Sequence, residues 1–98
     1  APTEATPLLI FPASFVQLMP EKAWQFGPNT PQVKIGGWLQ GAVMPVSSGR
    51  AAFFGEAAMF TAQVAGPDRI PIGMSAPQAE QNFQFVLNVM HWLSRVLP

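Results

Sequence analysis

The last quarter of the sequence constrains the fold most strongly, because residues 76–97 predict a long helix that is apolar on most of its sides. Its polar side chains recur at intervals of three or four residues and form one narrow stripe: Gln81, Gln84, Asn88, His91 and Arg95. The segment SAPQ, which begins at Ser75, has the pattern of a capping box with proline in the first turn, and it predicts the start of the helix. Such a helix needs cover on more than one side, and the rest of the chain has to provide it.

The chain has few polar side chains with which to cover the remaining surface. Of its 98 residues 49% are hydrophobic and only 10% are charged, whereas about 25% is the usual charged share. A chain of this length forms one domain with a modest margin for burying a core. We therefore expect a single domain over residues 7–98 that relies on a partner, and a flexible arm over residues 1–6, where proline and small polar side chains dominate.

Charge and composition argue against several classes of function. Five basic and five acidic side chains cancel, and they are scattered singly, so no nucleic-acid partner is predicted. An apolar run of about 18 residues is missing, which argues against a membrane span, and the APTEATP start lacks the features of a signal peptide. Because the chain has no cysteine and one histidine, we predict no metal site, and no cofactor is expected.

Two segments predict about three strands. Residues 8–11 form a continuous apolar run that is typical of a strand buried on both faces. Residues 33–55 predict a hairpin with Ser47, Ser48 and Gly49 as its turn. Glycines and a proline in the first half of that hairpin favour an edge strand, whereas AAFF in the second half indicates an interior strand.

A second, shorter helix is predicted over residues 57–65, with Gly66 and Pro67 as its stop signal. Residues 13–32, between the first strand and the hairpin, are interpreted as an ordered loop held by Phe15, Trp24 and Phe26. About three strands and two helices, one of them long and C-terminal, indicate an α/β fold class, with α+β as the alternative.

Two segments carry a resemblance to a known family. An apolar strand runs into GEAAMFTAQ over residues 55–63, and NFQFVLNVMHWL follows over residues 82–93. Together they resemble the C-terminal part of an uncharacterised bacterial family with the class I glutamine amidotransferase-like, flavodoxin-like fold. SFVQLMPEKAWQF and GGWLQGAV are similar to the same family, so the resemblance covers residues 7–97.

The resemblance implies a partial flavodoxin-like three-layer fold that forms the C-terminal portion of a larger domain. In active amidotransferases the nucleophilic cysteine belongs to the preceding half of the fold, and this chain has no cysteine, so glutamine hydrolysis is not implied. Members of the bacterial family look exported, which implies a location at the cell envelope.

One carboxylate, Glu56, stands at the predicted junction of a strand and a helix. There it could act as a general base or contact a ligand, or it could simply be stabilised by the helix dipole by about 0.3–1 kcal/mol. A small-molecule-binding or hydrolytic site formed by Glu56, Gln40 and the loop over residues 66–77 is therefore one hypothesis. Asn82 could face the same ligand, or it could bond the backbone of a loop.

The main hypothesis is a non-catalytic module that associates with itself, with the missing half of its own fold or with a protein partner at the cell envelope. Low charge and apolar excess predict a homo-oligomer, most simply a two-fold dimer. We expect its interface to combine the edge of the hairpin with one flank of the long helix. Large apolar side chains are the expected anchors: Trp38, Phe85, Val89 and Trp92.

Overall fold

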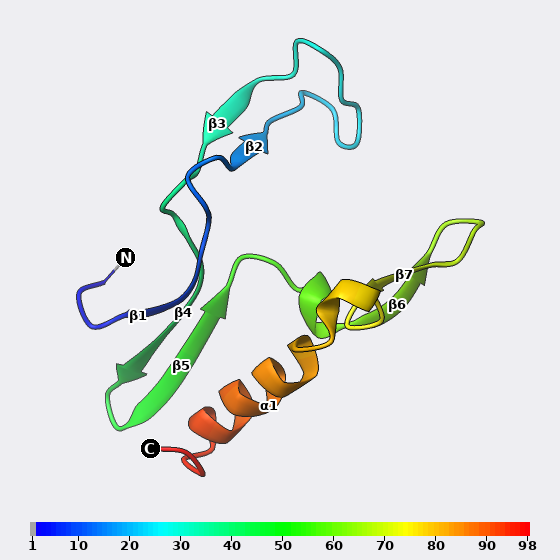
Figure 1. The fold of residues 1–98 in the computed structure, drawn as a ribbon. Helices are drawn as coiled ribbons and strands as arrows, with labels where there is room; N and C mark the ends of the chain where they lie inside the picture. The colour runs from blue at the N-terminus through cyan, green and yellow to red at the C-terminus, as the bar shows by residue number, and fades with distance from the viewer. Residues whose placement is uncertain (1) are drawn as a thin grey trace.

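The computed structural model describes residues 2–98, and this part of the chain is rich in strands, with one α-helix near its C-terminus (Figure 1). In chain order the elements are β1 (Thr6–Ile10), β2 (Val16–Leu18), β3 (Gln32–Lys34), β4 (Leu39–Val46), β5 (Gly49–Phe54), the 3-10 turn η1 (Ala58–Phe60), β6 (Ala62–Ala65), β7 (Ile70–Gly73), the 3-10 turn η2 (Pro77–Ala79) and α1 (Asn82–Leu93). The strands form one three-stranded sheet and two separate two-stranded ribbons.

The three-stranded sheet has the order β1-β4-β5, and both of its strand pairs are antiparallel. β4 and β5 form the hairpin that the sequence predicts, and Val46 pairs with Gly49 across a turn of Ser47 and Ser48. The residue with positive φ in this turn is Ser47, at 54°, not the glycine that follows. A two-residue turn of this kind continues the twist of the two strands.

The predicted flavodoxin-like three-layer α/β fold is wrong. Within residues 2–98 every strand pair is antiparallel, and the strands are divided among three small sheets. A parallel sheet needs a crossover connection, usually a helix, between successive strands. The chain supplies hairpins instead, because its connections between paired strands are short or lack a helix.

The second predicted helix, over residues 57–65, is also wrong. Only the short turn η1 is helical, and the chain then becomes extended at Thr61, with φ −108° and ψ 157°. Residues Ala62–Ala65 form β6, which pairs with β7 in a hairpin. Gly66, at φ 73°, and Pro67 therefore occupy the turn of that hairpin. The same two residues that stop a helix are equally suited to a turn.

The long helix is shorter than the sequence predicts. α1 has 12 residues and begins at Asn82, and neither Ala76 before η2 nor Gln81 before α1 makes a side-chain capping bond. Ala76 is extended, at φ −68° and ψ 140°, because a residue before proline is disfavoured in the helical region. Ser75 instead donates its backbone N–H to Ile72 in the turn that follows β7.

The places of two strands in the sheet are exchanged relative to the prediction. β4 was expected at an edge and is central, whereas β5 was expected inside and is an edge strand. Gly41 in β4 is buried, and a Cβ at this position would lie 2.7 Å from the ring of Phe54. The glycine is therefore needed because the Phe54 ring lies close to the backbone. Glycine in a strand commonly indicates such a close approach, and not always an edge position.

Two ribbons project from the main sheet and helix (Figure 1). β2 and β3 form one, and β6 and β7 form the other. β2 lies in the segment predicted as an ordered loop, whereas β3 (Gln32–Lys34) overlaps the start of the segment predicted as the hairpin. Trp24 does not hold the first of these segments in place, because its side chain is 88% exposed. A two-stranded ribbon without a covering layer is marginally stable in water.

The side chains that hold α1 to the sheet are aromatic. Phe54 of β5 lies 4.8 Å from Phe60 and 5.9 Å from Phe85, in both cases edge to face, and Phe60 stacks on Phe85 at 6.2 Å between ring centroids. These distances are within the range in which aromatic pairs add to apolar burial. The core is nonetheless small, since Ile35, at 6% exposure, is the one large apolar residue among residues 2–98 that is buried.

Candidate association surface

The chain exposes far more surface than a compact domain of its size. Its accessible surface is 7593 Å², and a compact monomer of the same mass, 10.6 kDa, has about 5,500 Å². Its radius of gyration is 16.3 Å, against about 13 Å for a compact domain of this length. Much of the additional surface is apolar, because large hydrophobic side chains in the main sheet, both ribbons and α1 are exposed.

One face of the main sheet is covered by α1. Leu8 of β1 and Val43 of β4 line a hollow of about 360 Å³ with the helix residues Phe85, Val89 and Trp92. The helix runs along β5 (Figure 1). Three of the four side chains predicted as interface anchors therefore face the sheet of their own chain. We call this side of the sheet the covered face.

The C-terminal end of α1 is fixed to the sheet by an arginine that the sequence did not single out. Arg50 Nη1 donates to the carbonyl oxygens of Trp92, at 2.6 Å, and Leu97, at 2.8 Å. Its Cζ also lies 4.8 Å from the centroid of the Trp92 ring, within range of a cation–π interaction. Arg95 in turn donates to the carbonyl of Ser48 in the hairpin turn. Two side chains thus connect the hairpin and the end of the helix.

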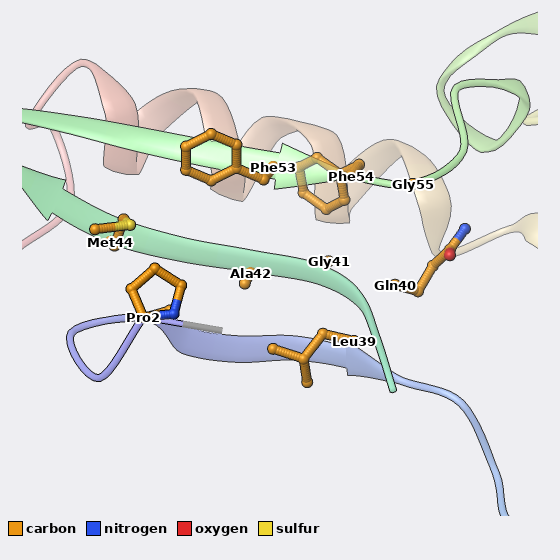
Figure 2. Close-up of a pocket in the computed structure, with 10 residues that line it drawn as sticks. Pro2, Leu39, Gln40, Gly41, Ala42, Met44, Phe53, Phe54 and Gly55 are labelled. Carbon is orange, nitrogen blue, oxygen red and sulfur yellow. The ribbon is translucent and has the colours of Figure 1, made fainter. Parts of the chain in front are cut away.

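The other side of the sheet has no covering layer within residues 2–98. Ala42 pairs with Phe53 and Met44 pairs with Ala51, and alternation places these four side chains on the side opposite Val43 and α1. We call this side the open face, and Figure 2 shows three of its four side chains. Phe53 is 57% exposed.

A shallow hollow of about 440 Å³ lies against the open face. Its lining contains no ionisable side chain, and Gln40 carries the one polar side chain in it. The turn at the N-terminus borders the hollow, with Pro2 close to Met44 (Figure 2). A surface that is apolar, uncharged and without a covering layer is a candidate for association.

Trp38, the fourth predicted anchor, lies elsewhere. It is 55% exposed and lines a hollow of about 480 Å³ together with Phe11, Phe15 and Ile35. The predicted anchors therefore occupy two separate places, one on α1 and one beside the β2–β3 ribbon. Neither place includes the open face.

Glu56 and Gln40 do come together, since both line the hollow that Trp38 occupies. One oxygen of Glu56, Oε1, accepts the backbone N–H of Ala57 at 2.8 Å and of Ala58 at 2.7 Å. The carboxylate thus accepts the first backbone N–H groups at the start of η1, the turn that begins two residues later at Ala58. The alternative considered for this residue was stabilisation by the dipole of a helix over residues 57–65, and that helix is absent, so these two bonds are a local contact with a short turn.

Asn82, the third predicted ligand residue, lies apart from Glu56 and Gln40. It lines a different hollow with Phe60 and Phe85, and its Nδ2 donates to the carbonyl of Met59 at 3.1 Å. The side chain therefore links the start of α1 to η1. Bonding to loop backbone was the alternative that the sequence left open for this residue.

The sequence could have shown that the four side chains of the open face lie on the same side of the sheet. Ala42 and Met44 on one side of the hairpin turn, and Ala51 and Phe53 on the other, are each spaced by two residues, which is the period of a strand. Once the turn is placed at Ser47 and Ser48, the pairing of these four residues follows. AAFF by itself shows no alternation of apolar and polar residues. The four residues are recognised as one face only when the two strands of the hairpin are aligned.

Comparison of the chain with protein-family models, with curated proteins and with solved structures finds no match. The glutamine amidotransferase-like resemblance therefore stays a prediction. In the part of the chain that the structure describes, no helix has the length and apolar character needed to cross a bilayer. Among the same residues no group of three or more histidine, cysteine, aspartate or glutamate side chains is arranged to hold a metal ion.

Proposed function

We propose that this protein is a non-catalytic association module that binds a second copy of itself, most simply as a two-fold dimer. The observation that carries the proposal is the excess of surface. The difference between 7593 Å² and the area of a compact monomer is about 2,100 Å². Large homodimer interfaces remove about 1,000–2,500 Å² of surface from each partner, and the excess lies within that range.

The two ribbons support the same proposal. Each has two short strands, and apolar side chains on both are exposed, among them Val16 and Leu18 on β2, Val64 on β6 and Ile70 on β7. Ribbons of this kind gain stability when another layer covers them. A partner chain would supply that layer, and it would also cover strand edges that otherwise invite unspecific pairing.

The ligand-binding alternative is less well supported. It requires a polar group that is free to meet a ligand, but the carboxylate of Glu56 already accepts two backbone N–H groups of its own turn. Asn82 is bonded to the backbone at Met59. Gln40 alone among the three predicted residues has no hydrogen bond of this kind within residues 2–98, and one amide does not make a site with chemical selectivity.

The test is the mass of the folded species. We expect light scattering at micromolar concentration to give twice the mass of one chain, which is 10.6 kDa, together with a circular dichroism spectrum rich in strand. Dilution should reduce the mass toward that of one chain, because a dimer dissociates by mass action. A monodisperse, folded species with the mass of one chain would contradict the proposal.

A further inference from the structure

We propose that the second copy docks on the open face, so that the two three-stranded sheets pack face to face and the two α1 helices lie on the outside. This inference rests on the proposed self-association and specifies where it occurs. It differs from the interface expected from the sequence, because Phe85, Val89 and Trp92 already face the sheet of their own chain.

The arrangement of the four side chains on the open face supports this choice. Ala42 lies directly across from Phe53, and Met44 lies directly across from Ala51. Along each strand a small side chain therefore alternates with a large one, and across each strand pair a small side chain is next to a large one. The two large side chains occupy one diagonal of the face, and the two alanines occupy the other.

This pattern is complementary to itself. If the two-fold axis runs between the sheets and parallel to the strands, β4 of one copy faces β5 of the other, so Ala42 meets Phe53 and Met44 meets Ala51. If the axis runs across the strands, β4 faces β4 in reverse, so Ala42 meets Met44, and Phe53 meets Ala51. In both cases every large side chain is opposite a small one, which is how the side chains of two packed sheets interdigitate at a separation of about 10 Å.

The chemistry of the face favours a second copy over a partner of another class. The hollow against the open face has no ionisable side chain in its lining, and the whole chain has no net charge. It therefore offers no electrostatic attraction to a nucleic acid, an anionic membrane or a charged protein surface. An isologous contact needs no opposite charge, because the same apolar patch is present on both copies.

The outer side of α1 is the competing surface, because Phe83 and Met90 are exposed there. Between them the polar stripe continues, with Gln84 Nε2 donating to Asn88 Oδ1 at 2.8 Å. Phe83, with 63% of its side chain exposed, compared with 57% for Phe53, provides a matched control for any substitution on the open face.

The first experiment compares Phe53→Glu with Phe83→Glu by sedimentation velocity over a range of protein concentrations. A carboxylate at position 53 would lose its water in the apolar interface between the two sheets, where no positively charged group would pair with it. We expect Phe53→Glu to raise the dissociation constant of the dimer at least about 100-fold, as for a central anchor of an interface. Phe83→Glu should leave the dissociation constant within about threefold of the unmodified chain, because position 83 stays in water.

The second experiment does not require a destabilising change. The chain has no cysteine, so Ala51→Cys introduces a single thiol on the open face. With strands about 4.8 Å apart and two-residue steps of about 6.8 Å, the two thiols of a face-to-face dimer lie within about 8 Å of each other. We expect a short bismaleimide to link the two copies efficiently. The exposed alanine at position 62, on β6, provides the matched control, and Ala62→Cys should give far less cross-linking.

The outcomes separate this inference from the proposal on which it rests. A dimer that persists in Phe53→Glu, dissociates in Phe83→Glu and gives no cross-link at position 51 would overturn the face-to-face arrangement while self-association stands. A single-chain mass for the unmodified protein would overturn both. If Phe53→Glu fails to fold, cross-linking at position 51 still decides, since its absence in a proven dimer contradicts the inference.

Discussion

The two faces of the β1–β4–β5 sheet are built from alternate residues of the same hairpin, and yet only one of them is covered. On the covered face, Val43 and Phe54 meet side chains of α1. On the open face, Ala42 and Phe53 line a hollow whose lining includes no residue of α1. The difference shows that apolar character does not by itself decide which side of a sheet becomes core. That depends on whether the chain has a second element long enough to cover it.

The covered face also has polar connections that the open face lacks. Arg50 binds two carbonyl oxygens at the end of α1 and stacks on Trp92. These contacts determine where the helix ends and how it lies against the hairpin. The open face, with no such group, presents a plain apolar surface, which is suited to a partner whose position is set by shape alone.

The largest effect expected concerns two neighbouring phenylalanines that point to opposite faces. Phe54→Ala removes the centre of the aromatic cluster with Phe60 and Phe85 and should lower the free energy of unfolding by about 3 kcal/mol. Phe53→Ala, measured by denaturant unfolding at dilutions where the chain is single, should lower it by about 0.5 kcal/mol or less. Equal losses for the two variants would show that the faces do not differ as described.

The next effect concerns the arginine that fixes the helix. Arg50→Lys keeps the charge but loses the planar group that contacts the Trp92 ring and two carbonyl oxygens, and it should lower the free energy of unfolding by about 1–2 kcal/mol. Faster hydrogen exchange at the backbone N–H groups of Val96 and Leu97, which bond to His91, should accompany that loss. Unchanged exchange at these two groups would mean that Arg50 does not fix the end of the helix.

The smallest effect concerns the expected cap of the helix that covers the sheet. The sequence pattern at Ser75 predicts that Ser75→Ala costs about 0.5–2 kcal/mol. In the structure no side chain caps η2 or α1, and so the change should alter the free energy of unfolding by less than about 0.5 kcal/mol. A thermal unfolding midpoint lowered by several degrees would instead support a cap at Ser75 and a helix that starts earlier than Asn82.

The elements with strong local signals were predicted well. The hairpin around Ser47 and Ser48 is present, and residues 82–93 are helical, because turn residues and helical periodicity act over a few neighbouring positions. Residues 57–65 misled the prediction. Their composition suits a helix, but Thr61 is extended and the following residues pair with β7, and local propensity does not reveal a pairing partner.

For the candidate site, too, the sequence predicted the type of side chain but not its place in the structure. Glu56, Gln40 and Asn82 were chosen for their chemical types, and the structure places the first two at one hollow and the third at another. Phe85, Val89 and Trp92 were chosen for size, and they lie against the sheet. Large apolar side chains are expected to be buried in a contact. Whether they contact their own chain or another chain depends on the position of the helix or strand that carries them.

By itself the sequence determined the hairpin turn, the final helix and the shortage of charge, since each depends on residue type and on neighbours along the chain. The tertiary structure alone decided that β4 is central, that the pairing is antiparallel and that α1 covers one face and leaves Ala42, Met44, Ala51 and Phe53 open. These outcomes depend on which distant segments meet. Alternation along the hairpin places apolar side chains on both faces of the sheet, so the sequence pattern does not show which face α1 will cover. The path of the chain in space decides this.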